Sequence, residues 1–204
     1  MTATLFFDTE TTGRVQKWDA PPSDPSHPMP VQLAAILRDD DTLKEISSLN
    51  VIIRPEGWVI EPGAAAVHGI SQEYAAQYGI ALENATWAFM GMLNAADMVV
   101  AHNLRFDATV MRRAAHVAEV PDIFAEKRPR CTMLASIPIC RILHKRPRHP
   151  TDFKYPKLDE AMLYFFNTGV GDDAHDALVD VRACIRVHDE LQKMRAFPDM
   201  AAAA

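Results

Sequence analysis

Short apolar runs open the chain, and they predict three β-strands. The run Leu5-Phe6-Phe7 is typical of a buried strand that ends at Asp8. A second apolar run covers residues 31–37, and a third covers 49–53 after the turn-like Asp39-Asp40-Asp41. The second and third runs are close enough along the chain to predict an antiparallel hairpin. Residues 14–30 contain five prolines and are predicted to form an ordered loop or a flap, because proline interrupts regular structure.

Helical spacing dominates the rest of the chain. From Phe106 onward, apolar residues recur at the spacing of one helical face, at Val110, Met111, Ala114 and Val117. The same pattern predicts a final helix from Ala177 to about Met194. Further helices are expected at residues 71–79, 83–96, 133–143 and 157–166, and a short strand at 98–101. This order of elements predicts an α/β fold with a mixed central sheet flanked by helices.

Length and composition are typical of a single globular domain. The 204 residues are 49% hydrophobic, which disfavours disorder, and no 18-residue window is uninterruptedly apolar. The domain is expected over residues 1–197, with 198–204 as a disordered tail. The start of the chain lacks the layout of a signal peptide, so a cytoplasmic location is expected. The three cysteines show no CxxC spacing, so buried thiols are favoured over disulfides or a cysteine zinc site.

Charge is divided unevenly along the chain. The net charge is −6, but residues 127–157 hold nine basic side chains and one acidic one, which makes that segment +8. The remainder, with 12 basic and 26 acidic residues, is −14. Such asymmetry is compatible with contact to a polyanion, and equally with a solvated basic loop.

The first acidic motif is Asp8-Thr9-Glu10-Thr11-Thr12-Gly13. Residues two apart on a strand project from the same face, so Asp8 and Glu10 are expected to point together. Two carboxylates beside an apolar strand are unfavourable unless a cation lies between them, and Mg²⁺ or Mn²⁺ prefers such oxygen ligands. Taken alone, the motif is also compatible with an exposed strand end before a turn.

Two further motifs begin helices. The first, His102-Asn103-Leu104-Arg105-Phe106-Asp107, follows the strand at 98–101, and the second, His175-Asp176-Ala177-Leu178-Val179-Asp180, opens the final helix. Asp107 or Asp176 could simply be a carboxylate that the helix dipole favours in the first turn. Four carboxylates, however, are the number needed to hold two divalent ions, and a histidine is suited to deprotonate water near neutral pH. The candidate catalytic set is therefore Asp8, Glu10, Asp107, His175 and Asp180, with the four acids as metal ligands.

In this order the three motifs resemble those of the DnaQ-like, or DEDDh, 3′→5′ exonuclease family, over nearly the whole chain. The resemblance implies a ribonuclease H-like fold and hydrolysis of nucleic acid from its 3′ end, with DNA favoured, using two Mg²⁺ or Mn²⁺ ions. It implies that Asp8 bridges both ions, that Glu10 and Asp180 complete the first site, and that Asp107 supports the second. The segment Lys154-Tyr155-Pro156-Lys157-Leu158, together with the proline-rich insertion, is similar to a phage and prophage branch of the family.

The resemblance also implies contacts to the substrate. Val67-His68-Gly69-Ile70 is similar to the segment that lies against the terminal nucleotide in proofreading subunits. Base, sugar and phosphate contacts are expected from Thr9, Thr11, Thr12, His68, Ile70, Asn103 and Phe106. Because the acidic part of the chain would repel its substrate, Arg146 and Arg148 of the basic segment are expected to guide the strand.

Three alternatives remain open at this level. One is an RNA-directed enzyme of the same fold, since no residue decides how the 2′-hydroxyl is treated. Another is a non-catalytic module that accompanies a polymerase, which the complete motif set disfavours. Residues 192–197 faintly resemble a sliding-clamp-binding peptide, but an amphipathic helix end is favoured there.

Overall fold

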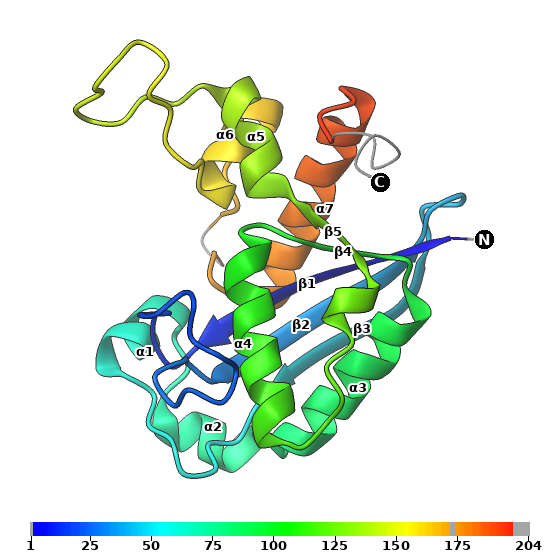
Figure 1. Ribbon diagram of the computed structural model, residues 1–204, viewed down its shortest axis with the longest axis vertical. Coiled ribbons are helices and arrows are strands. Elements are labelled where there is room, and N and C mark those ends of the chain that lie inside the picture. The colour runs from blue at the N-terminus through cyan, green and yellow to red at the C-terminus, as the bar shows by residue number, and fades with distance from the viewer. Residues whose placement is uncertain (1, 172–173, 198–204) are drawn as a thin grey trace.

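The computed structural model describes residues 2–171 and 174–197. A five-stranded sheet lies at its centre, in the order β3-β2-β1-β4-β5 (Figure 1). β1 (Ala3–Thr11), β2 (Pro30–Asp39) and β3 (Glu45–Ile52) are antiparallel neighbours. β4 (Met98–Ala101) is parallel to β1, and β5 (Arg128–Cys131) is parallel to β4. The predicted mixed α/β sheet is confirmed.

Alternation along β1 divides the core into two layers. Leu5 and Phe7 point to the face covered by α3 (Leu82–Ala95) and α4 (Leu104–Val117). Phe6 points to the opposite face, where it packs with Val181 and Cys184 of α7 (Ala177–Lys193). Figure 1 shows α3 and α4 in front of the sheet and α7 behind it. Both faces of β1 are therefore buried, so polar side chains at its end are conspicuous.

The remaining helices pack around this centre. α5 (Thr132–Cys140) and α6 (Leu158–Phe166) contact α7 through a second apolar cluster that includes Met162 and Leu191. α1 (Pro62–His68) and α2 (Gln72–Tyr78) lie beyond the end of β2 and share a small core around Val31 and Ile70. A 3₁₀ turn, η1 (Phe124–Glu126), precedes β5.

Two elements were not predicted. β5 has the sequence Arg128-Pro129-Arg130-Cys131, which lacks any apolar alternation, and it forms through pairing with β4 at the edge of the sheet, where proline is tolerated. α1 is short and has no buried residue among Pro62 to His68, so no amphipathic pattern marks it. Pro62 at its first turn and Gly69 in a left-handed conformation define its ends.

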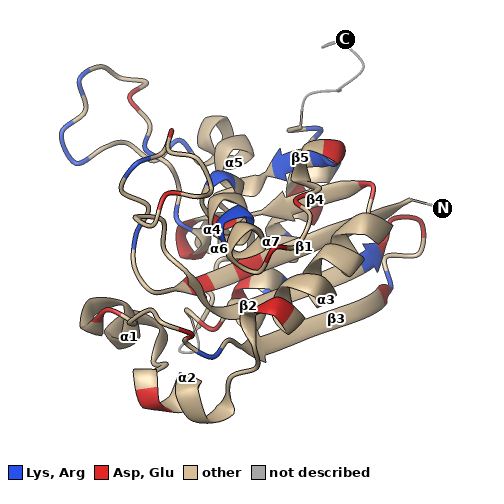
Figure 2. Cartoon of the chain, turned by 60° about the horizontal axis from the view of Figure 1, so that its bottom comes forward, with Lys and Arg blue, Asp and Glu red and all other residues tan. Residues whose placement is uncertain are grey.

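The basic segment 127–157 is not one loop. Its first part forms β5, and the helix predicted at 133–143 ends at Cys140, where Arg141 adopts a left-handed conformation with φ of 49°. Residues 141–156 then form a projecting hairpin, which we call the basic arm, with a bridge between Leu143 and Phe153 (Figures 1 and 2).

The proline-rich loop 14–30 is ordered without helix or strand, as predicted. Thr12 Oγ1 accepts a hydrogen bond of 3.0 Å from the Met29 amide, which closes the loop at its base. The guanidinium of Arg113 on α4 donates to the carbonyls of Pro22 and Ser23 at 3.2 and 3.1 Å. The loop is thereby fixed over the outer face of α4.

Near the end of the described chain, Phe197 packs back onto the domain. Its ring lies 5.2 Å from the His188 ring of α7 and 4.6 Å from the guanidinium carbon of Arg130. This packing supports a helix end rather than a free clamp-binding peptide at residues 192–197. The tail predicted at 198–204 lies outside the described residues. None of the described helices has the length and apolar character that a membrane span requires.

Candidate active site

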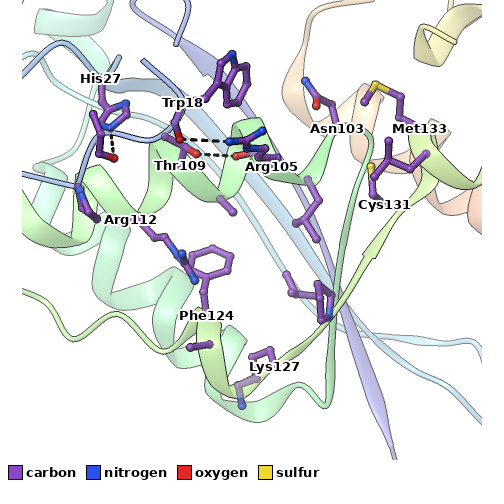
Figure 3. Close-up of a pocket in the computed structure, with 18 of the residues that line it drawn as sticks. Trp18, His27, Asn103, Arg105, Thr109, Arg112, Phe124, Lys127, Cys131 and Met133 are labelled. Carbon is purple, nitrogen blue, oxygen red and sulfur yellow. Dashed lines mark hydrogen bonds between the residues drawn. The ribbon is translucent and has the colours of Figure 1, made fainter. Parts of the chain in front are cut away.

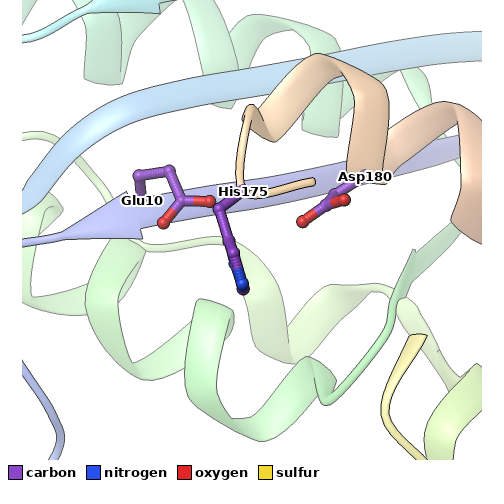
Figure 4. A group of neighbouring side chains, drawn as sticks. All are labelled: Glu10, His175 and Asp180. Atoms are coloured by element: carbon purple, nitrogen blue, oxygen red, sulfur yellow. The ribbon is translucent and has the colours of Figure 1, made fainter. Parts of the chain in front are cut away.

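Three of the predicted catalytic side chains meet at the end of β1. Oxygen or nitrogen atoms of Glu10, His175 and Asp180 all lie within 4.8 Å of one another (Figure 4). Glu10 comes from β1, His175 from the segment before α7, and Asp180 from the first turn of α7. Asp8 lies two residues before Glu10 on the same strand, which continues to Thr11 rather than ending at Asp8. Elements far apart in sequence thus converge on one point.

Asp107 joins this group from the other side of the sheet. It lies in the first turn of α4 and is only 3% exposed. Its Oδ1 accepts hydrogen bonds from the Thr9 amide at 3.1 Å and the Thr9 hydroxyl at 2.8 Å. Thr9, between Asp8 and Glu10, therefore holds the fourth carboxylate against β1.

The start of α7 is fixed by a network that the sequence analysis did not identify. Asp176 is the N-cap, and its Oδ1 accepts from the amides of Leu178 and Val179 at 3.0 and 3.2 Å. The side chain of Gln32 on β2 donates to Asp176 Oδ2 at 3.1 Å and accepts from the Ala177 amide at 3.1 Å. Gln32 is the one polar residue in the apolar run 31–37, and this was the signal available in the sequence.

The carboxylates disfavour each other's ionisation. The pKa of Asp8 is raised well above its ordinary value by burial, then by the charges of Asp107, Asp180 and Glu10. Burial, together with the charges of Asp180 and Asp107, raises the pKa of Glu10 to about 8. Burial and the nearby acids create a site of strongly negative potential wherever these groups are ionised.

Hydrogen bonds and the neighbouring histidine oppose this effect in part. Burial raises the pKa of Asp107 to about 7, against the hydrogen bonds from Thr9 that lower it. Burial raises the pKa of Asp180 to about 6, and His175 acts in the opposite direction. Four acids that raise one another's pKa, with oxygen donors only a few ångströms apart, form a donor set that fits hard divalent cations.

A cavity of about 640 Å³ lies beside this group and contains much of the predicted substrate contact set. Thr9, Thr11, His68 and Phe106 line it together with Glu10. The His68 Nδ1 accepts a hydrogen bond of 3.1 Å from the Ile70 amide, and burial lowers the pKa of this histidine. The ring of Phe106 and the imidazole of His68 give the cavity two flat surfaces near the carboxylates.

Other predicted contact residues lie elsewhere. Ile70 is buried in the small core with Val31, and Thr12 closes the base of the proline-rich loop. Asn103, in a left-handed conformation with φ of 80°, lines a different groove. Arg146 and Arg148 are exposed on the basic arm, which projects from the domain apart from the carboxylates (Figure 2).

Comparison with known proteins identifies the family. A profile of the exonuclease family of the RNase T type matches residues 5–188, which is most of the chain. The chain belongs to this exonuclease family. The matched residues contain all three acidic motifs, including Asp8, Asp107 and Asp180.

Solved structures share the ribonuclease H-like fold of this exonuclease domain. Escherichia coli exonuclease I in complex with a dT13 oligonucleotide is 19% identical with a TM-score of 0.73, over 94% of this chain and 41% of that one. The zinc-bound form of the E. coli enzyme with single-stranded DNA is 20% identical with a TM-score of 0.70, over 96% and 41%. Exonuclease I from Methylocaldum szegediense is 22% identical with a TM-score of 0.69, over 96% and 41%.

The chain therefore spans less than half the length of these solved relatives. Comparison with curated protein sequences gave no match. Similarity to a phage branch of the family remains a prediction.

Proposed function

We propose that this exonuclease is a metal-dependent 3′→5′ enzyme that hydrolyses single-stranded or frayed DNA ends and releases nucleoside 5′-monophosphates. The observation that carries the proposal is the convergence of Asp8, Glu10, Asp107 and Asp180, with His175, at the end of β1. Single-stranded DNA is favoured because solved relatives of this fold were crystallised with such oligonucleotides. Serving a polymerase or a sliding clamp remains a weaker expectation, and a cytoplasmic location is proposed on the absence of a recognisable signal sequence.

In this proposal the four carboxylates hold the cations. Asp8 lies between the other three acids in electrostatic terms, since each of them raises its pKa, so it is the residue best placed to be shared by two Mg²⁺ or Mn²⁺ ions. Glu10 and Asp180 belong to one side and Asp107, held by Thr9, to the other. Bound divalent ions supply charge stabilisation for the attacking and leaving oxygens of the phosphodiester.

His175 is proposed as the general base. Its imidazole is exposed at the edge of the group, so it can accept a proton from a water molecule at the scissile phosphate and pass it to solvent. The residue has a left-handed backbone conformation with φ of 73°, uncommon for histidine, immediately before the Asp176 cap. The Gln32–Asp176 network thus orients the base as well as α7.

The 640 Å³ cavity is proposed to receive the 3′-terminal nucleotide. Phe106 and His68 offer flat surfaces to its base or sugar, and a π-face contact of this kind does not depend on the base. The hydroxyl of Thr9 is engaged by Asp107, and that of Thr11 donates to the Gly13 carbonyl at 2.7 Å. Their role is therefore to shape the strand end and its backbone donors rather than to offer free hydroxyls.

End-labelled substrates test the function. Matched strands of DNA and RNA, single-stranded or paired with a complement, are labelled at either end and incubated with Mg²⁺ or Mn²⁺. The proposal predicts that a 3′ label is released first as a mononucleotide, whereas a 5′ label passes through a ladder of shortening products. Prior release of the 5′ label, or internal cleavage products only, would contradict it. Faster hydrolysis of RNA would assign the enzyme to RNA instead.

A further inference from the structure

The largest groove of the described structure has no role in the site above. It has a volume of about 1,160 Å³ and crosses the outer face of α4 (Figure 3). The proline-rich loop bounds it on one side, and η1, β5 and the start of α5 bound it on the other. Tyr155, at the root of the basic arm, completes the lining. We call it the α4 groove.

The lining of the α4 groove differs in charge from the rest of the chain. Among the described residues that line it, none is Asp or Glu, although the chain carries 27 acidic residues and a net charge of −6. Arg105, Arg112 and Lys127 contribute positive charge, and the aromatic rings include Trp18 and Tyr155. Cations together with exposed rings form the combination that holds unpaired nucleic-acid strands.

The arginines are engaged, but by exposed partners. The Arg105 guanidinium donates to Asp19 at 3.2 Å, and Arg112 lies 3.4 Å from Asp122. Ion pairs at such accessible positions contribute little, about 0–1 kcal/mol, so exchange of an aspartate for a phosphate costs little. The charges are thus available to a polyanion, while the acids keep the side chains extended in its absence.

Trp18 is held in position at the mouth of this groove. Its ring is 41% exposed, and Arg105 lies over it with the guanidinium carbon 5.0 Å from the centroid. The Phe106 ring approaches edge-on at a centroid distance of 6.5 Å. Because loop 14–30 is tied to α4 by Arg113, the indole is a fixed flat surface rather than a side chain on a free loop.

The α4 groove adjoins the cavity proposed for the terminal nucleotide. Asn103 and Arg105 line the groove, Phe106 lines the cavity, and Asp107 belongs to the carboxylate group. Successive residues in the first turn of α4 therefore face the groove, the cavity and the metal ligands. A strand whose end enters the cavity can continue over this turn into the groove.

We propose that the α4 groove binds the unpaired nucleotides that precede the 3′-terminal one, with a base stacked on Trp18 and phosphates at Arg105 and Lys127. This inference rests on the proposed function and deepens it. A base pair cannot place one of its bases flat on Trp18 without opening, so the groove makes the enzyme select strands with an unpaired 3′ tail.

The test compares Trp18→Ala with Trp87→Ala, which removes a tryptophan that is 52% exposed on α3 and outside the groove. Binding of a 5′-fluorescein strand of ten thymidines is measured by anisotropy in EDTA. Stacking of one base is worth roughly 1–3 kcal/mol, so Trp18→Ala is expected to raise Kd about tenfold. Trp18→Phe should recover most of the affinity, and Trp87→Ala should match the wild type.

A kinetic measurement separates strand binding from damage to the site. The ratio of kcat/KM for the ten-thymidine strand to kcat/KM for a thymidine dinucleotide should fall about tenfold in Trp18→Ala, through KM. An equal loss for both substrates, or a Kd like that of Trp87→Ala, would overturn the inference. If the wild type hydrolyses neither substrate, the proposed function fails, and the anisotropy comparison still decides whether the groove binds the strand.

Discussion

Gln32 lies directly opposite Glu10 in the antiparallel ladder of β1 and β2, and its side chain reaches the start of α7. It is 4% exposed, and its amide contacts both the Asp176 carboxylate and the Ala177 backbone. One side chain therefore links the strand that carries Glu10 to the segment that carries His175 and Asp180. The distance between those two parts of the site depends on it.

Replacement of Gln32 by Leu tests this link. The variant keeps an apolar volume in the sheet but loses both hydrogen bonds to α7, and a small displacement of a reacting group can cost about 10²-fold in rate. We expect kcat to fall about 10- to 100-fold with little change in KM. Asn50→Ala is the control, because Asn50 accepts the other amide bond of Gln32, at 3.0 Å, away from α7. Equal losses of kcat in the two variants would argue against a positioning role.

The pH dependence of stability reports the crowded carboxylates. In the metal-free protein the folded pKa is about 8 for Glu10 and about 7 for Asp107, against ordinary values near 4 in the unfolded chain. A raised folded pKa gives stability that is present below the unfolded pKa and is lost as pH rises through the folded pKa. The free energy of unfolding should therefore decrease between about pH 6.5 and 8.5.

This window avoids an opposing contribution from a buried histidine. Burial lowers the pKa of His102 to about 4, so its neutral form stabilises the fold as pH rises to about 6.5 and adds no slope above that. Denaturant melts in EDTA at several pH values measure the slope. Glu10→Gln should flatten it, and Mg²⁺ or Mn²⁺ should raise the melting temperature most at the alkaline end. A slope that is unchanged in Glu10→Gln would contradict the assignment.

His175 can be separated from the metal ligands by substitution with Gln. Loss of a positioned general base lowers the rate by roughly 10²–10⁴-fold, and the carboxylates that hold the cations remain. We therefore expect kcat to fall by that factor while the increase in melting temperature with Mn²⁺ is preserved. If the thermal shift disappears together with activity, His175 is a metal ligand and not the base.

The basic arm is predicted to steer the substrate. Arg146 and Arg148 are exposed on residues 141–156, while the chain as a whole is acidic. Replacing both with Ala should weaken binding of long strands and lower the slope of log affinity against log salt by roughly one unit. Lys44→Ala with Arg54→Ala removes two exposed charges near β3 and serves as the control. Slopes that agree in both double variants would leave the arm without this role.

The sequence predicted those features whose cause is local. Alternation along Leu5-Phe6-Phe7 and the apolar face from Val110 to Val117 placed the central strand and α4 correctly. The acidic motifs were found because each is short and contiguous, and the structure brings them together. β5 and α1 were missed because pairing with β4 and the terminal signals of a seven-residue helix leave no apolar period.

The links between the motifs could not be predicted in the same way. Gln32 acts across 144 residues on Asp176, and Thr9 across 98 residues on Asp107, so no local pattern reveals either contact. The α4 groove likewise combines residues of the proline-rich loop, α4, β5 and the root of the basic arm. Composition indicated the basic segment, but only the fold shows that β5 and α5 separate its two halves.

Replacement of Asp8 by Asn is the most direct test of the proposed metal-dependent site. Asp8 interacts with all three other acids, and its loss removes the ligand proposed to be shared. Release of mononucleotides from a single-stranded DNA in Mg²⁺ or Mn²⁺ is measured for the variant and the wild type. Because a bound cation contributes several kcal/mol, release should fall by about 10³-fold or more, with the metal-free melting temperature unchanged or raised. A variant that folds normally and releases nucleotides within about tenfold of the wild-type rate would contradict the assignment of this site.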